Sequence, residues 1–185
     1  TITTAVPFLL IAPDSRAGAL GDAGVATSPD ANSIHWNPAK LDIIEKDVIK
    51  NLYKAGVITI CCGGGGIPVF RDKDQLIGVE AVIDKDFTAA KLSEIISADM
   101  LLILTAVDQV AINFNKSNQQ YLTNMSVAEA KQYIAEGQFA PGSMLPKIEA
   151  SLKFIESNND GKILITSLEN AAKAIIGGSG TLIEK

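Results

Sequence analysis

The sequence has little of what nucleic-acid-binding and membrane-spanning proteins need. Its 185 residues carry 16 basic and 21 acidic side chains, a formal net charge of −5. Because a protein that neutralises many phosphates needs a basic face, this balance argues against a nucleic-acid partner. No apolar run approaches the roughly 18 residues that cross a bilayer, and the first residues lack the basic start of a secretory signal. With 47% hydrophobic and 20% charged residues, the chain has the composition of a globular domain.

Cysteine and histidine are also scarce, with two cysteines and one histidine in the chain. The two cysteines, Cys61 and Cys62, are neighbours in a run that has the pattern of a strand, where adjacent side chains point to opposite faces. A disulfide between them is therefore not expected, and a reducing compartment fits better. The only histidine, His35, stands beside Trp36 and is better explained as a packed or loop residue than as a ligand. No second pair of cysteines or histidines stands at zinc spacing, so we predict no metal site.

The pattern of the chain changes near Lys40. Four of the seven prolines fall within residues 1–40, where only one short apolar run, residues 7–12, interrupts an irregular segment. From Asp42 onward the pattern is regular, and a capping box of Asp42 and Glu45 predicts a helix that stops at Gly56. Further helices are expected at residues 87–96, 126–135 and 145–156, and strands at 57–62, 79–83, 100–105, 111–114, 163–166 and 181–183. This alternation predicts an α/β fold over residues 41–185, a three-layer αβα arrangement with a mainly parallel sheet.

Two polar or glycine-rich segments follow predicted strands, at the edge where open parallel sheets bind ligands. The first is the run Gly63, Gly64, Gly65 and Gly66. Consecutive glycines let backbone N–H groups approach an anion, although a plain tight turn would also use them. The second is Asp84-Lys85-Asp86, just before a helix. Lys85 can meet a phosphoryl group at the helix N-terminus, or Asp86 can cap the helix while Lys85 is solvated.

Two more segments complete this edge. Asp108 directly follows the predicted strand 100–105; it can accept hydrogen bonds from a ribose hydroxyl, orient a lysine, or simply form a turn. Residues 140–147 lead into a helix and place Lys147 inside its first turn, where the helix dipole disfavours a cation. Lys147 therefore needs compensation, and a bound phosphate would supply it; a solvated lysine is the alternative.

These segments, taken in order, resemble carbamate kinases of the amino-acid kinase family. The similar stretches are GGGGIPV at residues 63–69, GVEAVIDKD at 78–86, LTAVD at 104–108 and FAPGSMLPK at 139–147, with a closing part at 165–169 and 180–181. The resemblance runs over about residues 42–185. It implies a phosphotransferase that interconverts ATP plus carbamate with ADP plus carbamoyl phosphate, with Mg²⁺ on the nucleotide. No nucleic acid or membrane partner is expected for residues 41–185, and the implied location is cytoplasmic.

The resemblance also implies roles for individual residues. Lys85 and Lys147 would contact the β- and γ-phosphates, and Asp86 would hold these lysines in position. Asp108, Gly142 and Met144 would line the adenosine site, and the glycine run 63–66 would approach the reacting groups. Gln109 departs from the aromatic residue or glycine that is expected at its position. Positioning and electrostatics of this kind account for most of the catalysis of phosphoryl transfer.

The opening half of a carbamate kinase, with its Gly-Gly-Asn-Ala loop and carbamate site, has no counterpart here. In its place, residues 7–40 resemble the N-terminus of the outer-membrane barrel component of the type IX secretion apparatus, which would point to the outer membrane. We therefore expect a chimera joined near Lys40 and Leu41, with residues 1–40 foreign to the kinase. Two alternatives stay open: a non-catalytic nucleotide-binding fragment, and a fragment of the barrel. Since a parallel sheet would lose neighbours along one edge, we expect a homo-oligomer.

Overall fold

The computed structural model describes residues 45–62, 65, 69–73, 75–78 and 82–185, which belong to two compact units. Gly65 and residues 69–73, 75–78 and 82–83 form the described part of the first unit, and residues 45–62 and 84–185 that of the second. Several predictions lie outside the described residues. They concern the whole of residues 1–40, the joint at Lys40 and Leu41, the capping residue Asp42, most of the strand 79–83, and Gly63, Gly64 and Gly66.

The first unit contains a hairpin and one tight backbone approach. Strands β1 (Val69–Asp72) and β2 (Gln75–Gly78) pair in antiparallel register, and Lys73 in the turn has a positive φ of 53°. Gly65 has a φ of +152°, and a Cβ there would stand 2.1 Å from the backbone oxygen of Ile83. Only glycine fits this position, because any side chain would displace the backbone of residue 83.

A four-stranded sheet organises the second unit. Its order is β3 (Met100–Thr105), β7 (Lys162–Ser167), β8 (Thr181–Glu184) and β6 (Asn124–Ser126). The outer pairs β3–β7 and β6–β8 are parallel, and the central pair β7–β8 is antiparallel. The mainly parallel sheet is therefore confirmed. A separate hairpin of β4 (Val110–Ile112) and β5 (Gln120–Leu122) follows β3.

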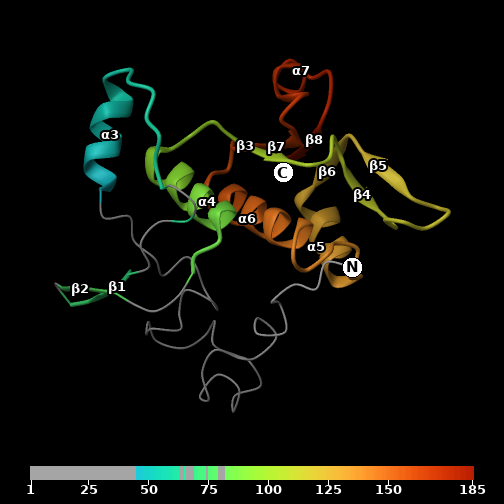
Figure 1. Ribbon diagram of the computed structural model, residues 1–185, viewed down its shortest axis with the longest axis horizontal. Helices are drawn as coiled ribbons and strands as arrows, with labels where there is room; N and C mark the ends of the chain where they lie inside the picture. The colour runs from blue at the N-terminus through green and yellow to red at the C-terminus, as the bar shows by residue number, and fades with distance from the viewer. Residues whose placement is uncertain (1–44, 63–64, 66–68, 74, 79–81) are drawn as a thin grey trace, which may run out of the picture. The chain divides into compact units, whose positions relative to one another are not determined.

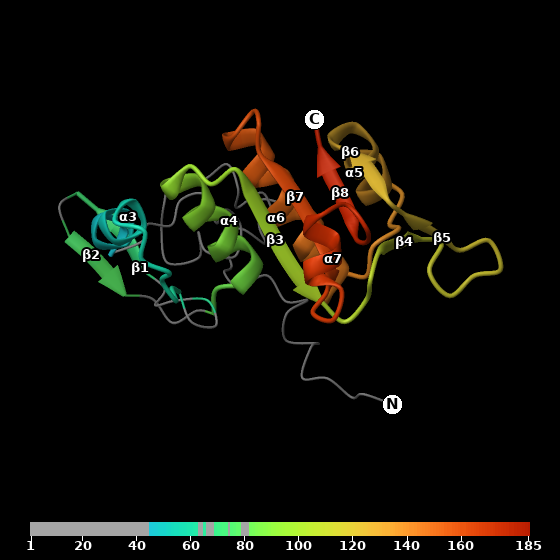
Figure 2. The same ribbon diagram turned by 90° about the horizontal axis from the view of Figure 1, so that it is seen from above.

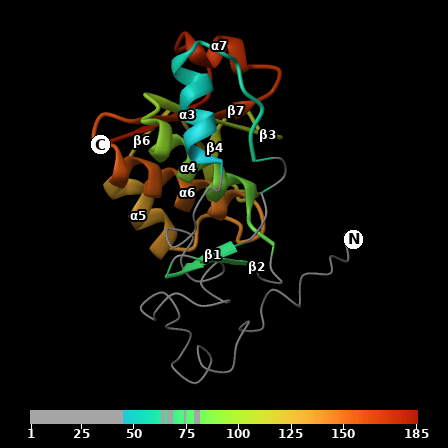
Figure 3. The same cartoon turned by 90° about the vertical axis from the view of Figure 1, so that its left-hand side faces the viewer.

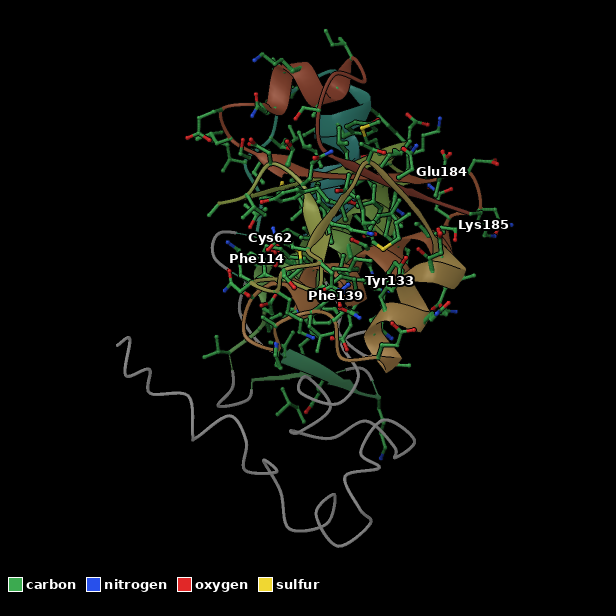
Figure 4. The ribbon with its side chains drawn as sticks, turned by 90° about the vertical axis from the view of Figure 1, so that its right-hand side faces the viewer. Cys62, Phe114, Tyr133, Phe139, Glu184 and Lys185 are labelled. Carbon is green, nitrogen blue, oxygen red and sulfur yellow. The ribbon has the colours of Figure 1, made fainter. Side chains whose placement is uncertain are left out.

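Helices lie on both faces of this sheet. α4 (Lys85–Ile96), α5 (Val127–Ala135) and α6 (Met144–Ser157) lie on one face, and the short α7 (Ala171–Ile175) lies on the other (Figure 1). The core lies on the three-helix side, where α6 buries Ile148, Leu152 and Ile155 as its spacing predicted. At one end of this core, Tyr133 and Phe139 meet edge to face, with ring centroids 6.3 Å apart (Figure 4). The expected αβα layering is thus present.

The capping box predicted at the start of α5 forms as expected. The side-chain oxygen of Ser126 accepts from the backbone N–H of Glu129 at 3.2 Å, and the Glu129 carboxylate accepts from the backbone N–H of Ser126 at 2.8 Å. Two of the orphan donors at this helix end are thus satisfied locally. The helix therefore begins where the sequence alone placed it.

The segment before Gly63 departs from prediction. Helix α3 (Lys46–Lys54) is present and packs against α4 (Figure 3). It buries none of its residues. Residues 57–62, predicted as a strand buried on both faces, form no strand, and Ile58 and Ile60 are 97% and 101% exposed. That prediction is wrong because a strand needs a hydrogen-bonded neighbour, and the described residues supply none beside this segment. Among the described residues, no helix is long and apolar enough to cross a membrane.

Candidate functional site

The topology of the second unit brings the start of two helices to the end of two strands. α4 turns directly into β3, and α6 turns into β7, each helix running back along its strand (Figure 2). The 12 residues of α4 rise about 18 Å and the six residues of β3 span about 20 Å, so the lengths match. The N-termini of α4 and α6 therefore lie at the same edge as the carboxyl ends of β3 and β7. This is the edge at which open α/β sheets bind their ligands.

An ion pair joins the two helix N-termini. The Nζ atom of Lys147 in α6 lies 2.8 Å from Oδ2 of Asp86 in α4, and the two residues are 61 positions apart in the sequence. Their side chains are only 11% and 9% exposed, respectively. Asp86 does not cap α4; Asp84 does, by accepting the backbone N–H of Asp86 at 2.7 Å. The Asp86 carboxylate is therefore left to hold the lysine.

The ion pair explains how Lys147 tolerates the first turn of a helix. We expected its unfavourable position in the helix dipole to require compensation, and in the described structure Asp86 provides it. The N-cap residue of α6, Ser143, makes no side-chain capping bond. The backbone N–H of Leu145 already donates to the oxygen of Ala140 at 3.1 Å, and Pro146 has no N–H. An anion at this helix end would therefore meet mainly the positive end of the dipole and the Lys147 ammonium.

Lys85 is the first residue of α4, next to Asp86. Its side chain is exposed. A cation at a helix N-terminus is disfavoured by the dipole, by less than about 1 kcal/mol when exposed. Lys85 therefore carries its charge at the same edge as Lys147, one residue from the ion pair.

A second polar group lies where β3 and β7 end. Oδ1 of Asp108 accepts from Nδ2 of Asn170 at 2.8 Å. The Ser167 hydroxyl and then Asn170, by hydrogen bonding, hold the pKa of the Asp108 carboxyl below its ordinary value, and the positive charge of Lys173 adds to this. The neighbouring Gln109 donates to the backbone oxygen of Gly180 at 3.3 Å.

Sequence reasoning missed Ser167 and Asn170. Ser167 lies within residues 165–169, which resemble the closing part of carbamate kinases, but no role was predicted for it. Asn170 follows this stretch and was not predicted as a site residue. A signal was available, because Ser167 ends β7 just as Thr105 ends β3, and the two are paired in the register of the parallel strands. Polar residues that follow adjacent parallel strands converge on one edge.

The remaining predicted site residues are less constrained. Met144, the first residue of α6, packs against the hydrophobic core. Gly142 is exposed and has open space where a Cβ would be, so no contact in the described structure requires glycine there. Gly65 belongs to the first unit and is described only with that unit. The ion pair and the Asp108 group are thus the predicted residues for which the structure gives specific polar partners.

A cavity of about 430 Å³ lies elsewhere, on the α7 side of the sheet. It includes Gln109 and the loop 177–180, but neither Lys147 nor Asp86 nor Asp108 lines it. This cavity therefore lies away from the charged edge of the described residues. The same residues contain no group of three or more acidic, cysteine or histidine side chains that could hold a metal ion.

Comparison with known proteins gives consistent matches. The model of the amino acid kinase family matches residues 16–167, a range that begins inside the segment predicted to be foreign. The chain is 56% identical over 149 residues to a carbamate kinase of Clostridium perfringens, covering 80% of this chain and 48% of the relative. A carbamate kinase of Latilactobacillus sakei is 51% identical over 149 residues, again covering 80% of this chain and 48% of the relative. The structure of a Giardia lamblia carbamate kinase bound to AMP-PNP superposes with a TM-score of 0.75 at 39% identity, over 78% of this chain and 46% of that one. The chain thus spans about half the length of these relatives.

Proposed function

The chain belongs to the amino acid kinase family, and on this basis we propose that it is the nucleotide-binding half of a carbamate kinase-type phosphotransferase. The proposed reaction moves a phosphoryl group between ATP and carbamate, giving ADP and carbamoyl phosphate. The observation that carries the proposal is the ion pair of Lys147 and Asp86, which places a nearly buried ammonium at two helix N-termini on the ligand-binding edge.

In the proposed site, Lys85 and Lys147 contact the β- and γ-phosphates of the nucleotide. Asp86 keeps the Lys147 ammonium in place, so that the charge is already oriented when phosphoryl transfer begins. The positive end of the α6 dipole adds a favourable field for the same anion. These groups suit a reaction in which charge spreads over phosphoryl oxygens and the protein supplies position and electrostatics.

The nucleoside and the metal complete the proposed site. Asp108, with Gly142 and Met144, lines the adenosine side, and the glycine run 63–66 approaches the reacting groups. Mg²⁺ enters with the nucleotide, because this ion is commonly held by substrate phosphates with few protein ligands. The chemistry of the described side chains, two ammonium groups and isolated carboxylates, fits a metal brought by phosphates.

Nucleotide binding is the first expected result. The chain should bind Mg-ADP in calorimetry, and Lys85→Met should weaken binding about tenfold, because one charge-assisted phosphate contact is lost. Stability should change little, since Lys85 is exposed. Lys153→Met is the matched control, because Lys153 is an exposed lysine in the middle of α6, away from the helix N-terminus. This variant should bind Mg-ADP like the unmodified chain. Absence of heat and of any thermal shift at millimolar nucleotide would refute the proposal.

Turnover by the isolated chain should be small. None of the described residues is assigned to carbamate, and the chain spans about half of its relatives. Coupled detection of ATP formed from carbamoyl phosphate and Mg-ADP should therefore give little or no signal above a blank without protein. Rapid ATP formation by the purified chain would show that the described half is sufficient for catalysis.

Three further points stand as proposals. Residues 1–40 remain proposed as a foreign segment resembling the secretion barrel, although the family match begins at residue 16. We place residues 41–185 in the cytoplasm, and we propose that the chain forms a homo-oligomer. The second candidate function, nucleotide binding without catalysis, is favoured by the half-length coverage of the relatives.

A further inference from the structure

The two adjacent cysteines are not held apart as a strand would hold them. Cys61 and Cys62 are free thiols of intermediate exposure at the end of the apolar run 57–62. The expectation that they point to opposite faces depended on this run being a strand. The run forms no strand, and Cys62 has a positive φ of 64°, in the left-handed region that residues other than glycine rarely adopt. The alternation that separates neighbouring side chains of a strand therefore does not apply here.

The two thiols lie close enough to influence each other. Burial raises the pKa of the Cys62 thiol, and the negative charges of Cys61 and then of Glu45 raise this pKa further. Cys62 is therefore protonated at neutral pH. Oxidants and alkylating agents react with the thiolate, so this thiol is poorly suited to either at neutral pH.

A direct disulfide between these neighbours is also disfavoured by length. Adjacent Cα atoms lie about 3.8 Å apart, whereas a disulfide usually joins Cα atoms about 4.4–6.8 Å apart. One atom inserted between the two sulfurs lengthens the bridge and relieves this mismatch. The inserted atom must be soft, because sulfur ligands prefer soft partners. Zinc does not fit, since it takes four ligands and the described residues contain no group of three acidic, cysteine or histidine side chains that could hold a metal.

We propose that Cys61 and Cys62 form a dithiol site that binds monosubstituted trivalent arsenic compounds. An arsenic atom of this kind carries one organic group and has two positions left, which the two sulfurs fill. With an arsine oxide, both S–H bonds break, two As–S bonds form, and the oxygen leaves with the two protons as water. Arsenic stays trivalent, so the step needs no oxidant or reductant. The inference is independent of the proposed function, because no nucleotide takes part.

The test titrates the reduced full chain with phenylarsine oxide. The intact mass under denaturing conditions should show one phenylarsenic group per chain, and one equivalent should consume both of the chain's two thiols. Because the second As–S bond forms within one chain, the affinity should exceed that of a single thiol by roughly 10²–10⁴. The adduct should therefore survive excess mercaptoethanol, which is a monothiol, and be released by the dithiol dithiothreitol.

Two variants each remove one thiol and serve as matched controls. Cys61→Ser and Cys62→Ser keep the side-chain shape at partly exposed positions, so both should fold. Each should bind phenylarsine oxide at least about a hundredfold more weakly and lose it in mercaptoethanol. In Cys61→Ser the pKa of Cys62 should also fall, because the Cys61 charge no longer raises it. The pH dependence of iodoacetamide alkylation at Cys62 measures this change.

The outcomes separate a shared site from two independent thiols. One phenylarsenic group that blocks both thiols and resists mercaptoethanol supports the proposal. Two groups per chain, or an adduct that mercaptoethanol removes, would overturn it, since each thiol would then react alone. A phenylarsenic bridge between two chains, seen as a dimer mass under denaturing conditions, would overturn it as well. If either folded single-cysteine variant binds as tightly as the unmodified chain, the other cysteine is not part of the site and the proposal fails.

Discussion

Replacing Asp86 by alanine is expected to lower the free energy of unfolding by about 3 kcal/mol, because the nearly buried Lys147 ammonium then has no opposite charge beside it. The Lys147 and Asp86 side chains are 11% and 9% exposed and lie 2.8 Å apart, so neither charge is well solvated once its partner is gone. Lys147→Met should be costly for the same reason. The double variant removes both charges. Its loss in the free energy of unfolding should be smaller than the summed losses of the two single variants, with a coupling energy of about 2 kcal/mol. Urea titrations followed by circular dichroism measure all three values.

A second ion pair, which joins α5 to α6, provides the control. Lys131 and Glu156 lie 3.0 Å apart, but their side chains are 56% and 55% exposed. The same cycle there, with Lys131→Met and Glu156→Ala, should give a coupling below about 0.5 kcal/mol, because water solvates each charge alone. Additive losses at Asp86 and Lys147 would mean that the pair is not coupled as its geometry implies. The Asp86→Ala variant should also bind Mg-ADP at least tenfold more weakly, since Lys147 is no longer held at the phosphates.

Local sequence signals predicted the elements whose stability is mostly local or self-contained. The capping box of Ser126 and Glu129 placed the start of α5 correctly, because both hydrogen bonds lie within four residues. The spacing of Ile148, Leu152 and Ile155 located the buried face of α6. The apolar run 100–105 gave β3 with its exact ends. In each case the decisive interactions follow from a pattern that a single segment carries.

Predictions that depended on distant partners fared less well. Residues 57–62 have strong strand propensity, yet they form no strand, because pairing requires a neighbour that the segment cannot specify. The antiparallel direction of β8 beside β7 was not predicted either, since the short apolar run at 181–183 carries no sign of direction. Hydrophobic periodicity reports burial and period, but not which strand lies alongside.

In the candidate site too, local patterns were predicted correctly and contacts between distant residues were not. The unfavourable dipole position of Lys147 correctly indicated that an opposite charge must be near. The structure supplies that charge from Asp86, 61 residues earlier, whereas the sequence pattern predicted a bound phosphate. Both can serve, because Asp86 leaves further donors of the ammonium free for an anion. The partners of Asp108 were missed because Ser167 and Asn170 become its neighbours only through the pairing of β3 with β7.

The unpaired segment has its own consequence for assembly. α3 buries no residue, and the following run 57–62 is apolar, uncharged and without proline. An exposed segment of this composition is a template for pairing with another chain. Because it carries no charge, a second copy of the same segment can pair with it without placing like charges opposite each other. This supports the proposed homo-oligomer over a stable monomer.

Introducing two lysines into this segment should therefore change the size of the particle. At micromolar concentration the unmodified chain should sediment as a species larger than its 19.5 kDa, whereas the variant Ile58→Lys/Ile60→Lys should sediment as a monomer. The two side chains are 97% and 101% exposed, so the substitution removes no packing within the described unit. Ile175→Lys/Ile176→Lys changes two other exposed isoleucines and should leave the larger species intact. A single monodisperse 19.5 kDa species of the unmodified chain, with cooperative unfolding, would show that residues 57–62 need no partner.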